Sequence, residues 1–221
     1  MMISNRAIIP AGNKGIITKG LIMAYRILTV ILLFISLSSH AENWELEMDK
    51  EGIRVFLSTP QDSSFKAYRA ETIIKALPGA IASILADMSL SCQLMYGCKQ
   101  ARLIKQQGYD YWAYSQIKAA WPVSDRDLSI YSHAELEEDG TIVVKVSALP
   151  ENVPAAKDHI RITKLDGFWK FIPIDSQTTQ VIYQVAAEPG GSVPAWLANK
   201  FVVDGPFETL KAFRQHAEAI K

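Results

Sequence analysis

Residues that could form an ion pair or hold a polar group are concentrated in the block Trp121-Pro122-Val123-Ser124-Asp125-Arg126-Asp127-Leu128. Pro122 disfavours helix at the residue before it, and a strand follows. Alternation along that strand places on one face Arg126, Leu128, Ile130, Ser132 and Ala134. An arginine therefore leads an apolar row. The same block is compatible with a plain turn, in which Arg126 forms a structural ion pair with a nearby acid.

The sequence contains no recognised catalytic or metal-binding pattern. His133, His159 and His216 lack the spacing of metal ligands, and there is no Gly-x-Ser-x-Gly elbow, phosphate loop or His-Glu-x-x-His helix. We therefore expect no metal, no cofactor and no catalysis. An enzyme stays open as an alternative, because Tyr114, Tyr183 and Arg161 would stabilise an enolate if their side chains converged.

Two cysteines, Cys92 and Cys98, are the only ones in the chain. Their spacing differs from the two-residue spacing of redox and zinc pairs. In an oxidising compartment we expect them to form a structural disulfide that closes the turn after a helix, in preference to a redox role.

Residues 1–41 have the pattern of a secretory signal. They contain four basic residues and no acidic one, and an apolar run from Ile27 to Leu37 precedes small residues at Ser39 and Ala41. The run is about half the roughly 20 residues that span a bilayer, so we expect cleavage after Ala41 and export, with a periplasmic location. An uncleaved anchor is the alternative. Met23 is a second candidate start, which would make residues 1–22 upstream read-through.

Removal of this segment leaves a mildly acidic protein. Of the 23 basic residues, 19 remain against 23 acidic ones, for a net charge of −4. A basic footprint typical of nucleic-acid binding is absent from this composition. Residues 42–221 are of a length that fits one domain with a substantial core.

Hydrophobic periodicity predicts mostly antiparallel strands. A hairpin with its turn at 49–52 is expected within 44–57, followed by strands at 65–74, 101–106, 109–119, 128–137, 141–149, 159–165, 168–174 and 178–187. The pattern changes to helical spacing twice, in a short segment that begins at Pro78 and in a long one from Pro194 to Ile220. Gly205-Pro206 should kink or interrupt the long helix.

Three blocks, taken in order, resemble one family. They are Trp121 to Leu128 as quoted above, Gly167-Phe168-Trp169-Lys170-Phe171-Ile172-Pro173, and Pro189-Gly190-Gly191-Ser192-Val193-Pro194-Ala195-Trp196-Leu197. Together they look like START domains, the lipid-transfer domains related to steroidogenic acute regulatory protein. The resemblance implies an α+β helix-grip fold, in which a curved antiparallel sheet wraps a long C-terminal helix and encloses a lipid tunnel.

A tunnel of this kind should be lined by apolar and aromatic side chains with few polar groups. The strand candidates are Tyr114, Ile130, Ser132, Val144, Val146, Arg161, Trp169, Phe171, Tyr183 and Val185, and the helix candidates are Trp196, Asn199, Val203, Phe207 and Leu210. Arg161 is the head-group candidate, although its polar face equally suits solvent. Trp169, Phe171 and Trp196 are alternatively plain core aromatics. Strands 109–119 and 128–134 offer no obvious buried acid and base, which argues against a sterol.

These features predict a monomer that binds and transfers a lipid or another hydrophobic molecule and touches membranes transiently. A cyclase- or hydrolase-like enzyme and an envelope lipid sensor are the alternatives. The loop Pro150 to Ala156 and the kink at Gly205-Pro206 are the expected gates, because the backbone there is irregular.

Overall fold

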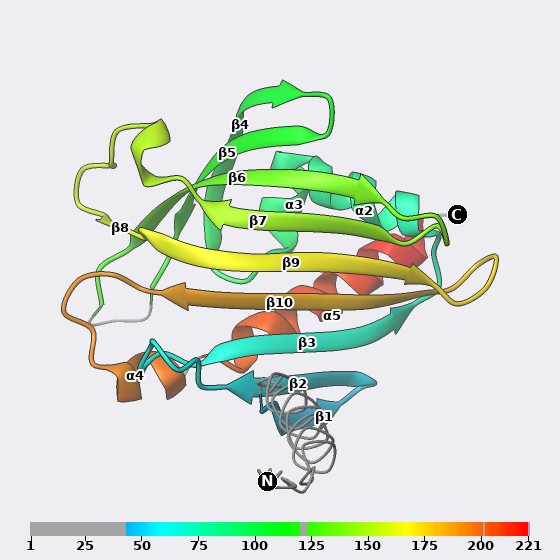
Figure 1. Ribbon diagram of the computed structural model, residues 1–221, viewed down its shortest axis with the longest axis horizontal. Coiled ribbons are helices and arrows are strands. Elements are labelled where there is room, and N and C mark those ends of the chain that lie inside the picture. Colours follow the sequence, from blue (N-terminus) through cyan, green and yellow to red (C-terminus); the bar gives the residue numbers. More distant parts are fainter. Residues whose placement is uncertain (1–42, 120–122, 201, 221) are drawn as a thin grey trace, which may run out of the picture. The chain divides into compact units, whose positions relative to one another are not determined.

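The computed structural model describes residues 43–119, 123–200 and 202–220, and Figure 1 shows their arrangement. The predicted signal segment with its cleavage after Ala41, the candidate start at Met23 and the Trp121-Pro122 turn lie outside these residues. Within the described residues, no helix combines the length and the apolar character needed to cross a membrane.

One ten-stranded sheet forms the body of the protein. Its main path runs β1-β2-β3-β10-β9-β7-β6-β5-β4, every neighbouring pair is antiparallel, and β8 pairs in parallel with β6 off this path. The strands are β1 (Glu45–Lys50), β2 (Ile53–Ser58), β3 (Ala67–Ile74), β4 (Cys98–Gln107), β5 (Asp110–Ile117), β6 (Arg126–Leu136), β7 (Ile142–Ala148), β8 (Ile160–Arg161), β9 (Lys164–Pro173) and β10 (Thr179–Glu188). The predicted curved antiparallel sheet is confirmed.

Turn chemistry explains the first hairpin. Glu51 and Gly52, which join β1 to β2, have φ angles of 54° and 71°. A two-residue hairpin turn with both central residues at positive φ matches the twist of the flanking strands, and glycine adopts that conformation without a steric penalty.

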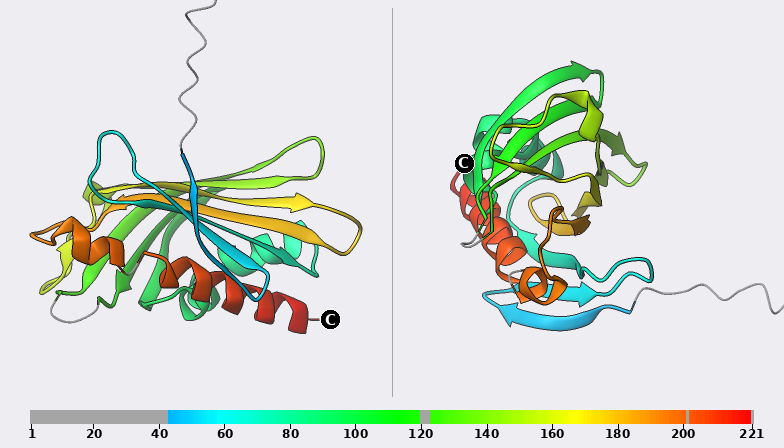
Figure 2. Two further views of the ribbon diagram at one scale, coloured as in Figure 1. Left: turned by 90° about the horizontal axis from the view of Figure 1, so that it is seen from below. Right: turned by 90° about the vertical axis from the view of Figure 1, so that its left-hand side faces the viewer.

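In the residues that the structure describes, four α-helices accompany the sheet. They are α2 (Pro78–Ala86), α3 (Met88–Leu94), α4 (Ala195–Lys200) and α5 (Asp204–Ala219). Pro78 opens α2, where its missing N–H costs nothing, and the Asp87 side chain accepts from two amides at the start of α3. Figure 2 shows that α2, α3 and α5 all lie on one face of the sheet. The helix-grip arrangement follows, with α5 as the long C-terminal helix.

The core lies between α5 and the strands at one side of the sheet. Ile53, Val55, Ile74 and Val181 from the strands meet Phe213 from α5, and each of these five side chains is fully buried. Burial of side chains of this size stabilises a fold by roughly 1.5–3 kcal/mol each. The core therefore occupies only part of the sheet face, and α5 is anchored to that part.

Two elements differ from the sequence-based expectations. The strand expected at 159–165 is reduced to Ile160–Arg161, and β9 begins at Lys164. The short helix at Pro78 is followed directly by a second one, α3, whose start is capped by Asp87. As predicted, the C-terminal helical region is interrupted near Gly205-Pro206: α4 ends at Lys200 and α5 begins at Asp204, which places Pro206 in the first turn of α5, where proline is tolerated.

The structure contains the expected disulfide between Cys92 and Cys98, which ties α3 to the start of β4. We predict that replacing both cysteines by serine lowers the free energy of unfolding by about 2 kcal/mol, since the closed loop is short and loop-closure entropy grows with its length. Denaturant unfolding monitored by circular dichroism measures this. A loss of about 3–5 kcal/mol in the free energy of unfolding, which is the cost of breaking a buried ion pair, would contradict the entropic explanation.

Candidate ligand-binding cavity

A cavity of about 720 Å³ lies between the sheet and the helices. Its wall is formed on one side by strands β3, β4, β5, β6, β7, β9 and β10 and on the other by α2, α3 and the first turns of α5. This volume falls within the usual range of small-molecule sites, roughly 300–1,000 Å³. The side chains of the sheet and of the helices therefore do not fill the space between them, and room for a small molecule is left.

Strand register determines which side chains face this space. Ile130 and Ser132 on β6 pair with Ala113 and Tyr111 on β5, and Val144 pairs with Trp169 on β9. Directly paired residues share a face of the sheet. The cavity-facing row of the sheet is consequently the apolar row that alternation indicates.

Hydroxyl groups dominate the polar part of the wall. Apart from the indole N–H of Trp169 and the carboxylate of Glu135, all of the polar lining side chains end in a hydroxyl, namely Tyr68, Ser83, Ser91, Tyr96, Tyr109, Tyr111, Tyr114, Ser115, Ser132, Tyr183 and Thr209. The carboxylate of Glu135 pairs with Lys145 at 3.3 Å, and its register partner is Val143, on the face opposite Val144. That carboxylate is thus directed away from the cavity.

Three stacked aromatic rings form a rigid part of the wall. Trp169 and Tyr183 lie parallel with their ring centroids 3.9 Å apart, and Tyr68 meets Tyr183 edge-on at 5.2 Å. Behind them, Trp169 packs against Phe213 of α5 at 5.0 Å. Burial raises the pKa of both Tyr68 and Tyr183, so both phenols are protonated at neutral pH.

The structure brings eight of the predicted site residues to the cavity wall and places seven elsewhere. Those in the wall are Tyr114, Ile130, Ser132, Val144, Val146, Trp169, Tyr183 and Val185. Although Tyr114 borders the cavity, its side chain lies on the opposite face of β5, because it pairs with Ser129 and not with the cavity-facing Ile130. Its hydroxyl donates to Asp127 on that face. Strand patterns thus placed all but two of the ten strand candidates in the wall, the exceptions being Arg161 and Phe171.

The helix candidates are corrected. Phe207 and Leu210 are buried in the core and Val203 packs against it, whereas α5 lines the cavity through Gly205, Pro206 and Thr209. The physical reason is that the apolar stripe of α5 faces packed strands, and its small residues face the open space.

The remaining aromatic and amide candidates also lie outside the wall. Phe171 is fully buried in the core, and Trp196 is 72% exposed on α4. Asn199 fixes the chain before β3, since its side-chain oxygen accepts from the amide of Lys66 at 2.9 Å and its nitrogen donates to Ser64 at 3.3 Å.

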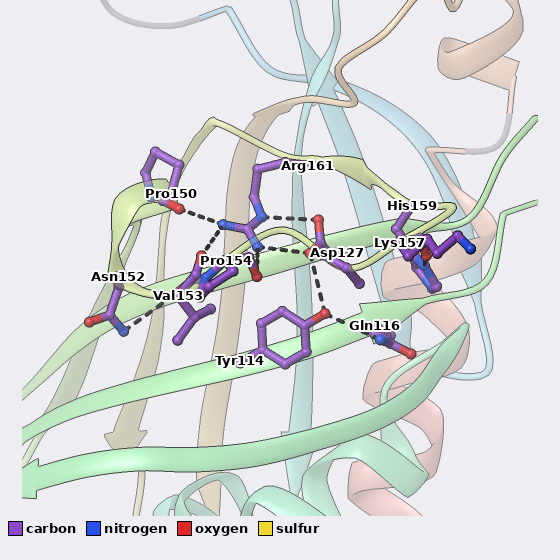
Figure 3. A network of polar contacts seen from close by, with 12 residues as sticks. Tyr114, Gln116, Asp127, Pro150, Asn152, Val153, Pro154, Lys157, His159 and Arg161 are labelled. Atoms are coloured by element: carbon purple, nitrogen blue, oxygen red, sulfur yellow. Dashed lines mark hydrogen bonds and ion pairs between the residues drawn. The ribbon is translucent and has the colours of Figure 1, made fainter.

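Arg161, the predicted head-group residue, lies in a buried ion pair instead of the cavity wall. Its Nε and Nη2 donate to the two carboxylate oxygens of Asp127 at 2.9 and 2.8 Å (Figure 3). The Asp127 side chain is fully buried, and that of Arg161 is 11% exposed. A buried acid and base are therefore present, but they lie outside the cavity wall. Sequence analysis missed the pair because its two residues are 34 positions apart.

The same network fixes the loop after β7. Arg161 donates to the carbonyl oxygens of Pro150, Val153 and Pro154, and the amide of Ala156 donates to Asp127 at 2.7 Å. None of the residues 150–158 lines the cavity. The loop that was expected to be a gate is therefore tied down on the outer side of β6.

Arg126 does not form the expected ion pair with a nearby acid. Its guanidinium donates to the carbonyl oxygens of Ser124, Pro189 and Gly190, and burial lowers its pKa. Gly190 has a φ of 68° and approaches β8 so closely that a Cβ would lie 2.9 Å from the Arg161 carbonyl oxygen. Arg126 thus joins the start of β6 to the turn after β10.

The described part of the chain, 43–119 with 123–200 and 202–220, contains no group of three or more His, Cys, Asp or Glu side chains arranged to hold a metal ion. The enolate arrangement of Tyr114, Tyr183 and Arg161 does not form either, because Arg161 and the Tyr114 hydroxyl are both engaged with Asp127. Tyr183 alone of these three faces the cavity.

Acidic pH should destabilise the protein through Asp127. Burial raises the pKa of this carboxyl, but bonds from Arg161, Ala156 and Tyr114 outweigh burial and hold the pKa below its usual value. A lowered folded-state pKa gives stability that is present above the unfolded pKa of about 4 and is lost as the pH falls through the folded-state value. We expect the melting temperature below about pH 4 to fall more steeply for the native protein than for Asp127→Asn.

Thermal unfolding followed by circular dichroism across this pH range measures the difference. Asp110, Asp125 and Asp139 also have lowered pKa values, from hydrogen bonds to their carboxylates, but they occur in both proteins and cancel in the comparison. Parallel pH profiles would contradict the assignment to Asp127.

Comparison with known proteins agrees with this architecture. The START domain pattern matches residues 33–221. A STAR-related lipid transfer protein fragment from Xanthomonas axonopodis superimposes with a TM-score of 0.74 and is 37% identical, over 79% of this chain and 98% of that one. An uncharacterized protein of Pseudomonas aeruginosa is 42% identical over 197 residues, which are 89% of this chain and 98% of that protein.

A more distant relative is the phosphatidylcholine transfer protein of Rattus norvegicus. It is 25% identical over 179 residues, covering 76% of this chain and 81% of the rat protein. The pattern match covers far more than half of the chain, and the sheet, the C-terminal helix and the enclosed cavity agree with it. The chain belongs to the START domain family.

Proposed function

We propose that this protein binds a lipid or a similar hydrophobic molecule in the cavity and transfers it between membranes. The single observation that carries the proposal is the cavity of about 720 Å³ with an apolar, hydroxyl-bearing wall. A buried methylene gains about 0.8 kcal/mol, so a sixteen-carbon chain would cost on the order of 12 kcal/mol to carry through water unshielded. An enclosed apolar wall removes most of that cost.

The proposal includes export, a monomeric state and brief contact with a membrane surface. Trp196 supports the contact, because an exposed tryptophan has the amphipathic ring that favours membrane interfaces. The relatives with lipid transfer in their names support transfer over mere storage. Catalysis is not part of the proposal.

Mass spectrometry of the organic extract from natively purified protein tests binding. We expect one class of apolar compound at close to one molecule per protein. Transfer of that compound between donor and acceptor vesicles then separates a carrier from a sensor, which would hold the compound without moving it. Chemical conversion of the extracted compound on incubation would favour an enzyme and overturn this proposal.

A further inference from the structure

The cavity wall is unsuited to a phosphate group. Among the lining residues of the described chain there is no lysine or arginine, and the one carboxylate, that of Glu135, is paired with Lys145 on the other face. An anionic group placed in such a space would be buried without a counter-charge, which costs several kcal/mol.

The nearest buried arginines cannot supply that charge. Arg161 has its guanidinium bonded to Asp127 and to three loop carbonyls, and Arg126 has its own bonded to three more carbonyls. Because an arginine has five N–H donors in a fixed plane, neither side chain can turn to a ligand without breaking these bonds. Both arginines instead hold the backbone around β6 and β8 in place through these bonds.

Two phenols in the wall are suited to an uncharged oxygen. Tyr68 and Tyr183 both line the cavity, and the stacking of Tyr183 on Trp169 fixes its ring. The rings of the two tyrosines are in edge-on contact, and burial raises the pKa of both phenols, so each keeps its hydroxyl hydrogen at neutral pH. Both hydroxyl groups lie in the cavity wall and can donate to an acceptor oxygen there.

We infer that the ligand is an uncharged lipid whose hydroxyl or carbonyl oxygen bonds to the Tyr68–Tyr183 pair, and that lipids with a phosphate head are excluded. This inference rests on the proposed function. It separates the protein from a carrier of phospholipids, although a phosphatidylcholine transfer protein is among its relatives. The remainder of the ligand fills the apolar space beside Ile130, Val144 and Val146.

A matched pair of ligands tests the excluded head group. We would measure binding of 1-palmitoylglycerol and of 1-palmitoylglycerol 3-phosphate to delipidated protein, by displacement of a fluorescent hydrophobic probe. The two compounds share one acyl chain and differ only in the phosphate. We expect the phosphate to bind at least about 100-fold more weakly, since a buried unpaired anion costs several kcal/mol and each 1.4 kcal/mol is tenfold.

Tyrosine-to-phenylalanine variants test the polar contact. Tyr183→Phe and Tyr68→Phe should each weaken binding of 1-palmitoylglycerol by up to about 10-fold, because the ligand oxygen loses a donor. Tyr131→Phe is the matched control. Tyr131 on β6 does not line the cavity, and its hydroxyl donates to Asp110 on β5. Circular dichroism checks that each variant is folded.

The outcomes are distinct. Equal binding of both compounds would overturn the excluded phosphate while leaving the carrier proposal intact. Selective binding of 1-palmitoylglycerol that Tyr183→Phe leaves unchanged would overturn the tyrosine contact. Failure of both compounds, together with an extract that contains no apolar compound, would overturn the proposed function itself.

Discussion

Replacing Arg161 by methionine is expected to lower the free energy of unfolding by about 3–5 kcal/mol. The change leaves Asp127, which is fully buried, without its cation, and removal of one partner of a buried ion pair costs this much. It also releases the carbonyls of the loop after β7. Denaturant unfolding at neutral pH measures the loss.

Arg54→Met is the matched control. Arg54 also contacts a carboxylate, that of Glu71 at 2.9 Å, but its side chain is 51% exposed, so its loss should cost less than about 1 kcal/mol. The double change Arg161→Met with Asp127→Leu removes both buried charges and should recover part of the stability. Equal losses from Arg161→Met and Arg54→Met would show that burial of the pair is unimportant.

Cross-linking the turn after α3 to α5 is expected to reduce lipid transfer between vesicles at least about 10-fold. Tyr96 and Gly205 both line the cavity, and a Cβ on Gly205 would lie 3.7 Å from the Tyr96 ring, in ordinary contact. The turn after α3 and the first turn of α5 both line the cavity, so we expect the ligand to pass between them, and closing such a lid should stop exchange. Tyr96→Cys with Gly205→Cys, joined by a short bismaleimide, provides the test.

A second cross-link controls for rigidity alone. Lys75→Cys with Glu218→Cys joins the far end of α5 to the end of β3, where the Glu218 carboxylate accepts from the Lys75 amide at 3.0 Å. Neither position lines the cavity, so transfer should be unchanged. Both native cysteines are in the disulfide and do not compete for the reagent. Undiminished transfer after linking 96 to 205 would exclude this gate.

Sequence periodicity predicted strands such as β2, β3 and β10 well because one face of each is more buried than the other. The row Leu128, Ile130, Ser132, Ala134 lines the cavity as its alternation indicates, and a shift of one residue would have exposed it to solvent. Alternating hydrophobicity therefore predicts both where a strand lies and which of its side chains face the interior.

Periodicity was a poorer guide to the helix and to the polar residues. Leu210 and Gly205 both lie on α5, yet the apolar one is in the core and the small one faces the cavity. An apolar stripe shows that a face is buried but does not distinguish packed atoms from a void. The Asp127–Arg161 pair was missed because it depends on a contact between strands 34 residues apart, which no local pattern encodes.

The pairing of β3 with β10 determines how the chain must fold. It joins Tyr68 to Val185 and Ile74 to Thr179, so every pair spans more than 100 residues. Long-range pairing of this kind slows folding, because the entropy of closing a long loop is lost before any contact repays it. Until β10 is available, one edge of β3 is an open template for aggregation. The ligand compartment therefore cannot be assembled in stages during synthesis, and its walls first meet when nearly the whole polypeptide is present.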